Sequence, residues 1–362
     1  MSGGVLFEGL IQAPMAGAQN SRMAMEVCRA GGLGSIPAAM LSLEALAKEI
    51  ETMQEATSVP FNVNFFAHTL LPLEPTRQRL WQEILHKYFR EYDIDPQKLP
   101  EAAQRLPFSS AHLDILQQYR PAVVSFHFGL PEERLFQAVK DTGAKVIASA
   151  TTVAEAHYLA ERGVDAVIAQ GSEAGGHRGM FLNVLPGHEE NLANVATQLG
   201  TFALLPQVVE AMQKYNLPVI ASGGLAGGTS FKAAKALGAS AVQVGTSYLL
   251  SSESLIGPLH RAALLAAKAD PSQHVTALTN VFTGKPARSL ATRLMRELRY
   301  IHRQVNEFPY ASQEISALRA AAEPQGVGSF TPMWCGQNLG ACEELPAYEI
   351  TQKLLAQWEA CR

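Results

Sequence analysis

The stretch KVIASATTVAEAHYLAERGVDAVIAQG, residues 145–171, contains one complete strand–helix–strand pattern. Its two apolar runs, KVIASAT (145–151) and AVIAQG (166–171), are too short for helices and lack alternation, as expected of strands covered on both faces. Between them, VAEAHYLAERG (153–163) is helix-like and ends at a glycine suited to a helix C-cap. The stretch therefore predicts two strands joined by a helix.

The same pattern continues on both sides of this unit. Helix-like segments such as LEALAKEIETM, PEERLFQAVKDTG and FKAAKALGA separate six further short apolar runs. These runs predict strands at LIQAPM (10–15), GLGSIPA (32–38), FNVNFF (61–66), VVSFHF (123–128), PVIASGG (218–224) and AVQVGTS (241–247). Eight strands alternating with helices is the count of a TIM (β/α)8 barrel, although a doubly wound open sheet would give a similar alternation. We therefore expect an α/β fold, with a TIM barrel over residues 1–252.

Two long segments do not fit the simple alternation. Residues 72–118 predict a helical insertion, with Trp81, Ile84, Leu85 and Tyr88 at helical spacing. We expect it to pack on the barrel; the alternative is an aromatic lid over a site. Residues 253–335 predict a smaller, mainly helical second domain that contributes a substrate lid. Residues 336–362 predict a C-terminal segment that returns to the barrel, with a closing helix at 345–360.

Composition and charge restrict the class of protein. The 362 residues are 47% apolar and 17% charged, which is typical of a soluble globular protein. Lys+Arg 29 against Asp+Glu 33 gives a net charge of −4, so no basic field indicates nucleic acid. No apolar run is long enough to span a membrane, and the first residues lack the pattern of a signal peptide. The scattered cysteines Cys28, Cys335, Cys342 and Cys361 predict reduced thiols in a cytoplasmic protein. A homo-oligomer is left open.

Polar and glycine-rich residues follow the predicted strands, at the ends where barrel enzymes place their chemistry. ASGGLAGG (221–228) and QVGTSYL (243–249) follow the seventh and eighth strands, where barrels frequently bind a phosphate through backbone N–H groups and a helix N-terminus. Glycine also serves ordinary tight turns, but two such loops in this order favour a phosphate site. The other strand ends carry Gln12-Ala13-Pro14-Met15, Asn64, His127, Thr151-Thr152 and Gln170 to Arg178.

The loop after the sixth strand, QGSEAGGHRGM (170–180), holds four glycines around a histidine. Its glycines would let the backbone lie against a planar ligand, and Gln170 could hydrogen bond to the edge of a heterocycle. With His127 at another strand end, His177 is a candidate for proton transfer. The alternatives are a tight turn at Gly175 and Gly176 and a histidine bonded to a backbone carbonyl. Glu173 could pair with Arg178, lie in solvent or be catalytic.

The stretch KPARSLATRLMRELRYIHR (285–303) gathers Arg and Lys residues. It predicts a basic helix with a solvated face. The alternative places one of its cations, or Tyr300, over an anionic ligand, and the sequence does not select which.

Several of these stretches resemble the bacterial nitronate monooxygenases of class I, formerly called 2-nitropropane dioxygenases. The resemblance rests on QAPMAG (12–17), AGGLGS (30–35), FNVNFF, SFHFGLP (125–131), residues 151–179, ASGGLAGG and QVGTSYL. GKPAR (284–288) and MWCGQ (333–337) extend it, whereas the tail NLGACEELPA departs from the family pattern. Related flavin-dependent quinone and enoyl reductases share the barrel and phosphate motifs but differ at QGSEAGGHRG and SFHFGLP.

The resemblance implies an FMN enzyme that oxidises alkyl nitronates with O2, through a flavin semiquinone, to a carbonyl compound and nitrite. It implies catalytic roles for His177 and, on the substrate side, His127. Together with the strand ends it implies flavin contacts at Ala13, Pro14, Met15, Asn64, Gln170, Gly175, Gly176, Ser222, Gly223, Gly224, Gln243, Val244, Gly245 and Thr246. The alternatives are an FMN-dependent NAD(P)H:quinone or enoyl reductase and a barrel that binds a phosphorylated metabolite without turnover.

Overall fold

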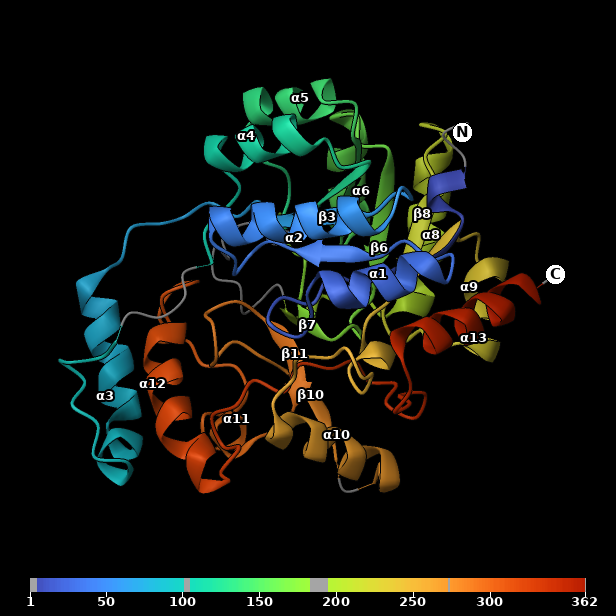
Figure 1. The fold of residues 1–362 in the computed structure, drawn as a ribbon. Helices are drawn as coiled ribbons and strands as arrows, with labels where there is room; N and C mark the ends of the chain where they lie inside the picture. The colour runs from blue at the N-terminus through green and yellow to red at the C-terminus, as the bar shows by residue number, and fades with distance from the viewer. Residues whose placement is uncertain (1–4, 101–104, 183–194, 273, 362) are drawn as a thin grey trace.

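The computed structural model describes residues 5–100, 105–182, 195–272 and 274–361 (Figure 1). Eight strands of the described chain form one parallel sheet in the order β1-β9-β8-β6-β5-β4-β3-β2. They are β1 (Gly9–Gln12), β2 (Ser35–Pro37), β3 (Asn62–Phe66), β4 (Val123–His127), β5 (Lys145–Ala150), β6 (Ala166–Gln170), β8 (Val219–Ser222) and β9 (Ala241–Val244). Each lies within or overlaps a predicted run.

The sheet closes on itself between β1 and the chain leading into β2. The N–H of Gln12 donates to the carbonyl of Leu33 over 2.9 Å, and the N–H of Leu33 donates to the carbonyl of Leu10 over 2.9 Å. These bonds join the first and last strands of the sheet order, so the open doubly wound alternative is wrong. The predicted TIM barrel is confirmed.

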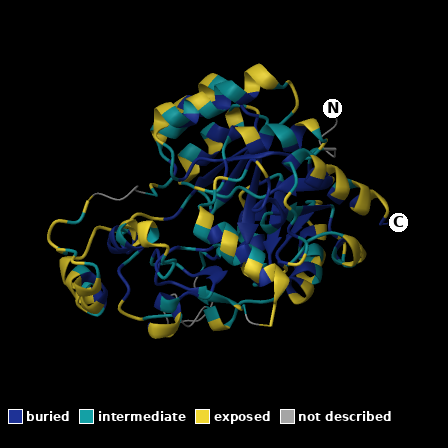
Figure 2. Cartoon of the chain, turned by 60° about the horizontal axis from the view of Figure 1, so that its bottom comes forward, coloured by how far each residue is buried: buried dark blue, intermediate teal, exposed yellow. Residues whose placement is uncertain are grey.

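Apolar side chains fill both faces of the strands, which explains their lack of alternation. Inside the barrel, Val123, Ile147 and Ile168 pack with Phe7, which the short helix η1 (Val5–Phe7) places against them. Their neighbours Val124, Val146 and Val167 belong instead to the large cluster between strands and helices. Figure 2 shows the strands buried and the outer helix faces exposed.

Helices cover the barrel in the order expected of repeated strand–helix units. They are α1 (Ser21–Arg29), α2 (Leu43–Ala56), α4 (Ser110–Tyr119), α5 (Glu133–Asp141), α6 (Val153–Glu161), α8 (Thr201–Gln213) and α9 (Gly228–Ala236). Only the short helix η2 (Thr246–Tyr248) directly follows β9, and α13 (Ala347–Glu359) packs against α1, β1 and α9. The Trp358 ring of α13 lies 6.1 Å from that of Phe231 on α9. No described helix is long and apolar enough to cross a membrane.

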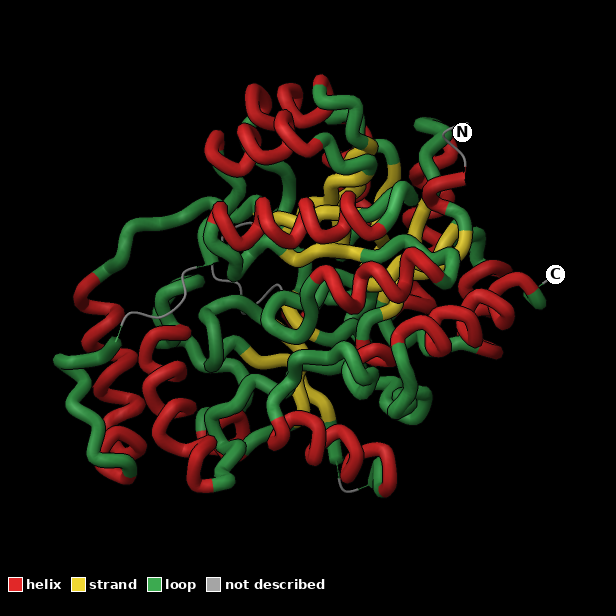
Figure 3. Tube along the Cα trace, in the orientation of Figure 1, coloured by secondary structure: helices red, strands yellow, loops and turns green. Residues whose placement is uncertain are grey.

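The second part of the structure is mainly helical, as predicted, and it also contains a small sheet. It contains α10 (Pro258–Ala269), β10 (Thr276–Thr279), β11 (Ala287–Leu290), α11 (Arg293–Glu297), α12 (Ser312–Ala322) and η3 (Glu323–Gln325). β11 pairs antiparallel with β10 and with β7 (Gly176–His177), which comes from the loop after β6. Figure 3 shows this small sheet beside the barrel strands. Because β11 and the five-residue α11 divide residues 285–303, the single basic helix predicted there is wrong.

The packing predicted for residues 72–118 is also partly wrong. Helix α3 (Pro75–Glu91) lies beside α12, away from the barrel (Figure 1), whereas α4 packs on α2 and α5 of the barrel. Trp81, Leu85 and Tyr88 are buried in a cluster formed with residues 281–330, and Ile84 packs on its edge. The helical spacing was correct, but it could not say which surface the apolar face covers. The domain limits 1–252, 253–335 and 336–362 stay a proposal.

Candidate active site

A pocket of about 270 Å³ lies at the carboxyl ends of the barrel strands. Its lining includes both predicted histidines and every predicted flavin-contact residue except Val244. These residues are Ala13, Pro14, Met15, Asn64, His127, Gln170, Gly175, Gly176, His177, Ser222, Gly223, Gly224, Gln243, Gly245 and Thr246. Val244 is buried in the core, where its carbonyl accepts the N–H of Ala13 over 2.8 Å. It holds the turn after β1 in place.

The β8 and β9 region of this pocket contains polar groups that have no hydrogen-bond partner among the described residues. Gly223 and Gly224 have φ angles of 114° and 67°, a backbone conformation that favours glycine. Among the described residues, no hydrogen bond uses the N–H of Gly224 or Leu225 as a donor. On β9, the buried Oε1 of Gln243 has no hydrogen-bond partner among them. Such groups fit a flavin, whose phosphate accepts and whose heterocycle donates hydrogen bonds.

The four glycines of residues 170–180 serve different purposes. A Cβ at Gly171 would lie 1.9 Å from Thr201 Oγ1, one at Gly175 would lie 2.4 Å from the Cys335 carbonyl carbon, and one at Gly179 would lie 2.9 Å from the His127 ring. These three are therefore required by close packing within the protein. Only Gly176, with φ 70°, faces open space: a Cβ there would have no described atom within 4 Å, so its backbone could approach a ligand.

Gln170 holds this loop rather than presenting a free amide. Its Nε2 donates to the His177 carbonyl over 3.1 Å, and its Oε1 accepts the N–H of Gly179 over 2.7 Å. Arg178 supports the loop from the buried side by donating to the carbonyls of Gly171 and Gln170 over 2.6 and 2.7 Å. Burial lowers the pKa of Arg178 to about 9. The loop is thus fixed in shape by its own polar side chains.

Glu173 holds the start of a helix, a role that was not considered for it from sequence. Its two carboxylate oxygens accept the N–H of Thr201 over 3.0 and 2.8 Å, and one also accepts the Thr201 hydroxyl over 2.9 Å. Thr201 is the first residue of α8, so Glu173 caps this helix from a distant loop. The ion pair with Arg178, one of the alternatives left open from sequence, does not form between these described residues.

Both ring nitrogens of His127 have partners within the protein. Nε2 lies 3.1 Å from the His177 carbonyl, and Nδ1 lies 3.0 Å from Ser149 Oγ. Since a carbonyl only accepts, Nε2 carries the proton and Nδ1 accepts from the Ser149 hydroxyl. Burial lowers the pKa of His127 to about 4, partly offset by its bond to the His177 carbonyl. The neutral ring therefore positions the backbone of His177.

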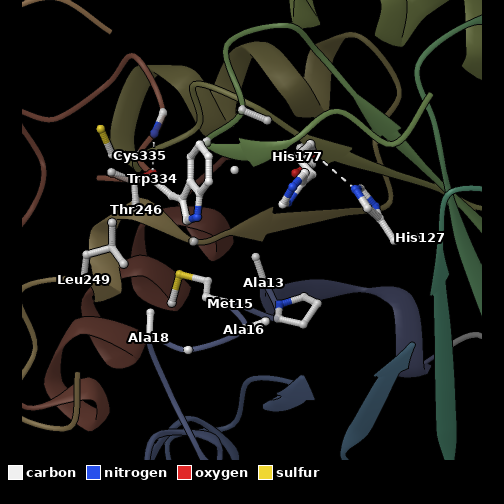
Figure 4. A pocket seen from close by; sticks show the side chains of 18 of the residues that line it. Ala13, Met15, Ala16, Ala18, His127, His177, Thr246, Leu249, Trp334 and Cys335 are labelled. Atoms are coloured by element: carbon white, nitrogen blue, oxygen red, sulfur yellow. Dashed lines mark hydrogen bonds between the residues drawn. The ribbon is translucent and has the colours of Figure 1, made fainter. Parts of the chain in front are cut away.

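His177 lies in an aromatic setting with one nitrogen bonded to the second part of the chain. Its Nε2 is 2.9 Å from Thr283 Oγ1, and its Nδ1 has no hydrogen bond to any described residue. Its ring centroid lies 5.5 Å from that of Trp334 and 6.0 Å from that of Phe66. Figure 4 shows His177 and Trp334 across the pocket from Met15 and Ala13. Burial, followed by the charge of Arg105, lowers the pKa of His177 well below its ordinary value.

Several residues that line the pocket were not predicted as site residues from sequence. Arg105, His260, Arg319 and Trp334 all belong to segments outside the strand ends. Of these, only Trp334 lay in a quoted motif, MWCGQ, which carried no assigned role. None of residues 285–303 lines the pocket, so the alternative that placed one of them over a ligand is not supported.

The C-terminal segment connects the two glycine-rich loops. The N–H of Gly336 donates to Thr246 Oγ1 over 2.9 Å, and Asn338 Nδ2 donates to the Gly224 carbonyl over 3.1 Å. The N–H of Gln337 donates to the Glu173 carbonyl over 3.0 Å. The segment therefore fixes the positions of both loops and of the loop after β6.

A family model and two curated relatives carry the same family description. A family model described as "Nitronate monooxygenase" matches residues 5–357. The chain is 36% identical to a nitronate monooxygenase of Pseudomonas aeruginosa over 96% of its length and 95% of the relative. It is 33% identical to a probable nitronate monooxygenase of Staphylococcus saprophyticus, covering 96% of the chain and 94% of the relative.

Two solved structures have a similar fold. The structure of nitroalkane oxidase from Streptomyces ansochromogenes has a TM-score of 0.85 and 34% identity, and the match covers 99% of this chain and 97% of that one. FabK from Thermotoga maritima has a TM-score of 0.69 and 26% identity, with 98% and 94% coverage. The family model matches nearly the whole chain, including all segments that line the pocket at the strand ends. The chain therefore belongs to the nitronate monooxygenase family of flavin-dependent oxidoreductases.

Proposed function

We propose that this protein binds FMN and oxidises alkyl nitronates with O2 to a carbonyl compound and nitrite. The observation that carries the proposal is one pocket that combines two glycine-rich loops, an unpaired buried Gln243 oxygen and the free Nδ1 of His177. The family membership and the likeness to a nitroalkane oxidase support it. Bound flavin supplies the electron-accepting chemistry, because a nitronate is already a carbanion equivalent.

The protein's own groups would hold the cofactor at two places. The backbone N–H groups of Gly224 and Leu225 and the N-terminal turn at Thr246 suit a phosphate. Gln243 Oε1 suits an N–H donor of the heterocycle, since a buried acceptor without a partner is costly. Asn64 lines the same space, held by bonds from its Nδ2 to the hydroxyl and carbonyl of Ser125 over 2.9 and 3.3 Å.

The Thr283 hydroxyl would set the role of His177. This hydroxyl lies 2.9 Å from His177 Nε2 and 3.4 Å from the Lys285 carbonyl. If it donates to the nearer nitrogen, Nδ1 carries the proton and can donate to a nitronate oxygen. If it donates to the carbonyl, Nδ1 is a free base that could take a proton from a neutral nitroalkane. The shorter contact favours the donor role toward a nitronate.

The test begins with the absorption spectrum of the purified protein and mass spectrometry of the released ligand. FMN is expected, because the two loops form a single proposed phosphate site and no GxGxxG turn indicates a dinucleotide. Under anaerobic conditions, ethylnitronate should bleach the flavin, and with O2 the reaction should release nitrite. Bleaching by NADH but not by ethylnitronate would instead support the alternative reductase, and FAD as the ligand would contradict the cofactor assignment.

The cytoplasmic location and any self-association are proposed from sequence alone. All four cysteines are buried free thiols, which suits a reducing compartment.

A further inference from the structure

Two arginines, Arg105 and Arg319, line the pocket, and none of the described residues that line it carries a carboxylate. The histidines of the pocket supply no positive charge at neutral pH. Burial lowers the pKa of His127 and of His260 to about 4 and lowers that of His177 well below its ordinary value. The permanent positive charge of the pocket lining therefore comes from Arg105 and Arg319.

The two arginines differ in their partners. Arg319 donates through Nε to Glu323 Oε1 over 2.6 Å. Arg105 is half-buried and makes no hydrogen bond or ion pair with any described residue. Burial and the nearby charge of Arg319 lower the pKa of Arg105. A half-buried guanidinium beside a like charge, with no acceptor among the described residues, is stabilised when it binds an anion.

Two observations indicate that Arg105 lies near His177 in the pocket lining. Three residues after it, the N–H of Phe108 donates to the Phe66 carbonyl at the end of β3 over 2.8 Å. The Phe66 ring lies 6.0 Å from the His177 ring. Among charged groups, Arg105 has the largest influence on the titration of His177. Arg105 and His177 therefore address the same part of the pocket.

We propose that Arg105 binds the two oxygens of the substrate nitronate and selects this anion over the neutral nitroalkane. The proposal rests on the proposed function. A nitronate presents two oxygens in one plane, as a carboxylate does, and a guanidinium can donate two parallel N–H bonds to such a pair. An arginine stays charged across the working pH range, so the site remains selective for the anion.

Binding of nitrate, a planar oxyanion, to the flavin-loaded enzyme tests Arg105 without requiring turnover. Arg105→Gln should weaken nitrate binding about 10- to 100-fold, the range for hydrogen bonds to charged groups, and Arg105→Lys should weaken it less. Arg303→Gln removes the same charge from an exposed residue outside the pocket and should leave binding unchanged. Calorimetry or the flavin spectrum reports affinity, with flavin content and Tm confirming that each variant is folded.

The steady-state rates with two substrates test selectivity. Arg105→Gln should raise KM for ethylnitronate about 10- to 100-fold and lower kcat/KM for nitroethane less, because the neutral substrate gains negative charge only as its proton leaves. Nitrate binding to Arg105→Gln as tight as to the wild type, equal weakening in Arg303→Gln, or no nitrate binding by the wild type would overturn the assignment. An equal loss with both substrates would do the same, since it indicates a structural role.

The two proposals fail separately. If the wild type binds nitrate through Arg105 but does not oxidise ethylnitronate, the anion site stands and the proposed function is wrong. If ethylnitronate is oxidised and nitrate binding does not depend on Arg105, the function stands and the role of Arg105 is wrong.

Discussion

Replacing His177 by leucine tests whether its imidazole contacts the substrate. The ring lines the pocket, with Nε2 bonded to Thr283 Oγ1 over 2.9 Å and Nδ1 without a partner among the described residues. His177→Leu removes both ring nitrogens, including the Nδ1 without a partner, and keeps a side chain of similar size in this aromatic setting. A hydrogen bond to a charged group contributes about 1.5–3 kcal/mol. At about 1.36 kcal/mol per factor of ten, kcat/KM for ethylnitronate should fall about 10- to 150-fold.

Comparison with nitroethane separates a hydrogen-bond donor from a general base. Loss of a general base reduces the rate about 10²–10⁴-fold. Because burial lowers the pKa of His177 well below its ordinary value, its neutral ring is a weak base. We therefore expect the loss with nitroethane to be no larger than the loss with ethylnitronate. Both rates are measured at equal flavin content.

Thr283→Val provides the matched control, because it removes only the hydroxyl that holds the ring. A neutral hydrogen bond contributes about 0.5–1.5 kcal/mol, so the rate with ethylnitronate should fall about 2- to 10-fold. In the His177→Leu background the same change should have little further effect, since the two groups act together. A selective loss with nitroethane would identify His177 as a base. No loss with either substrate would refute the reasoning and give His177 a purely structural role.

Three further predictions concern stability. Gly175→Ala should lower the free energy of unfolding by about 1–3 kcal/mol in urea titrations, because its Cβ would lie 2.4 Å from the Cys335 carbonyl carbon. Gly340→Ala, where a Cβ would meet open space, should change this free energy little, and equal effects of the two variants would contradict the reasoning. Glu173→Ala should cost about 0.5–2 kcal/mol through the lost cap of α8 while kcat is retained, and a collapse of kcat would instead make Glu173 catalytic. Burial lowers the pKa of His260 to about 4 in the folded protein, so below about pH 6.5 the unfolded chain binds more protons at this residue than the folded protein does. Tm should therefore fall as the pH is lowered from about 6.5 toward 4, and it should fall less steeply in His260→Asn. Identical slopes in the two proteins would contradict this.

The barrel and much of its pocket could be predicted from local sequence features. Short apolar runs without alternation identify strands covered on both faces, and their order along the chain indicates which loops share one end of the barrel. This reasoning predicted that His127, His177 and the loops at Gly224 and Gly245 lie around one pocket, and the structure places them there. The sequence itself could not separate a closed barrel from an open sheet, because closure depends on two bonds between Leu33 and the first strand.

What each side chain does within that pocket was decided by tertiary contacts. Glu173 caps a helix that begins 28 positions later, and Gly175 is required by the approach of Cys335, although nothing near either residue in sequence indicates these partners. Arg105 was missed because it follows no predicted strand, and α3 was assigned to the wrong surface because amphipathic spacing specifies only that a face is buried. Periodicity and turn glycines act over a few residues, so the sequence determines elements and their order. The partners of a capping carboxylate, a close-packed glycine or an unpaired arginine come from distant segments, so only the folded chain determines them.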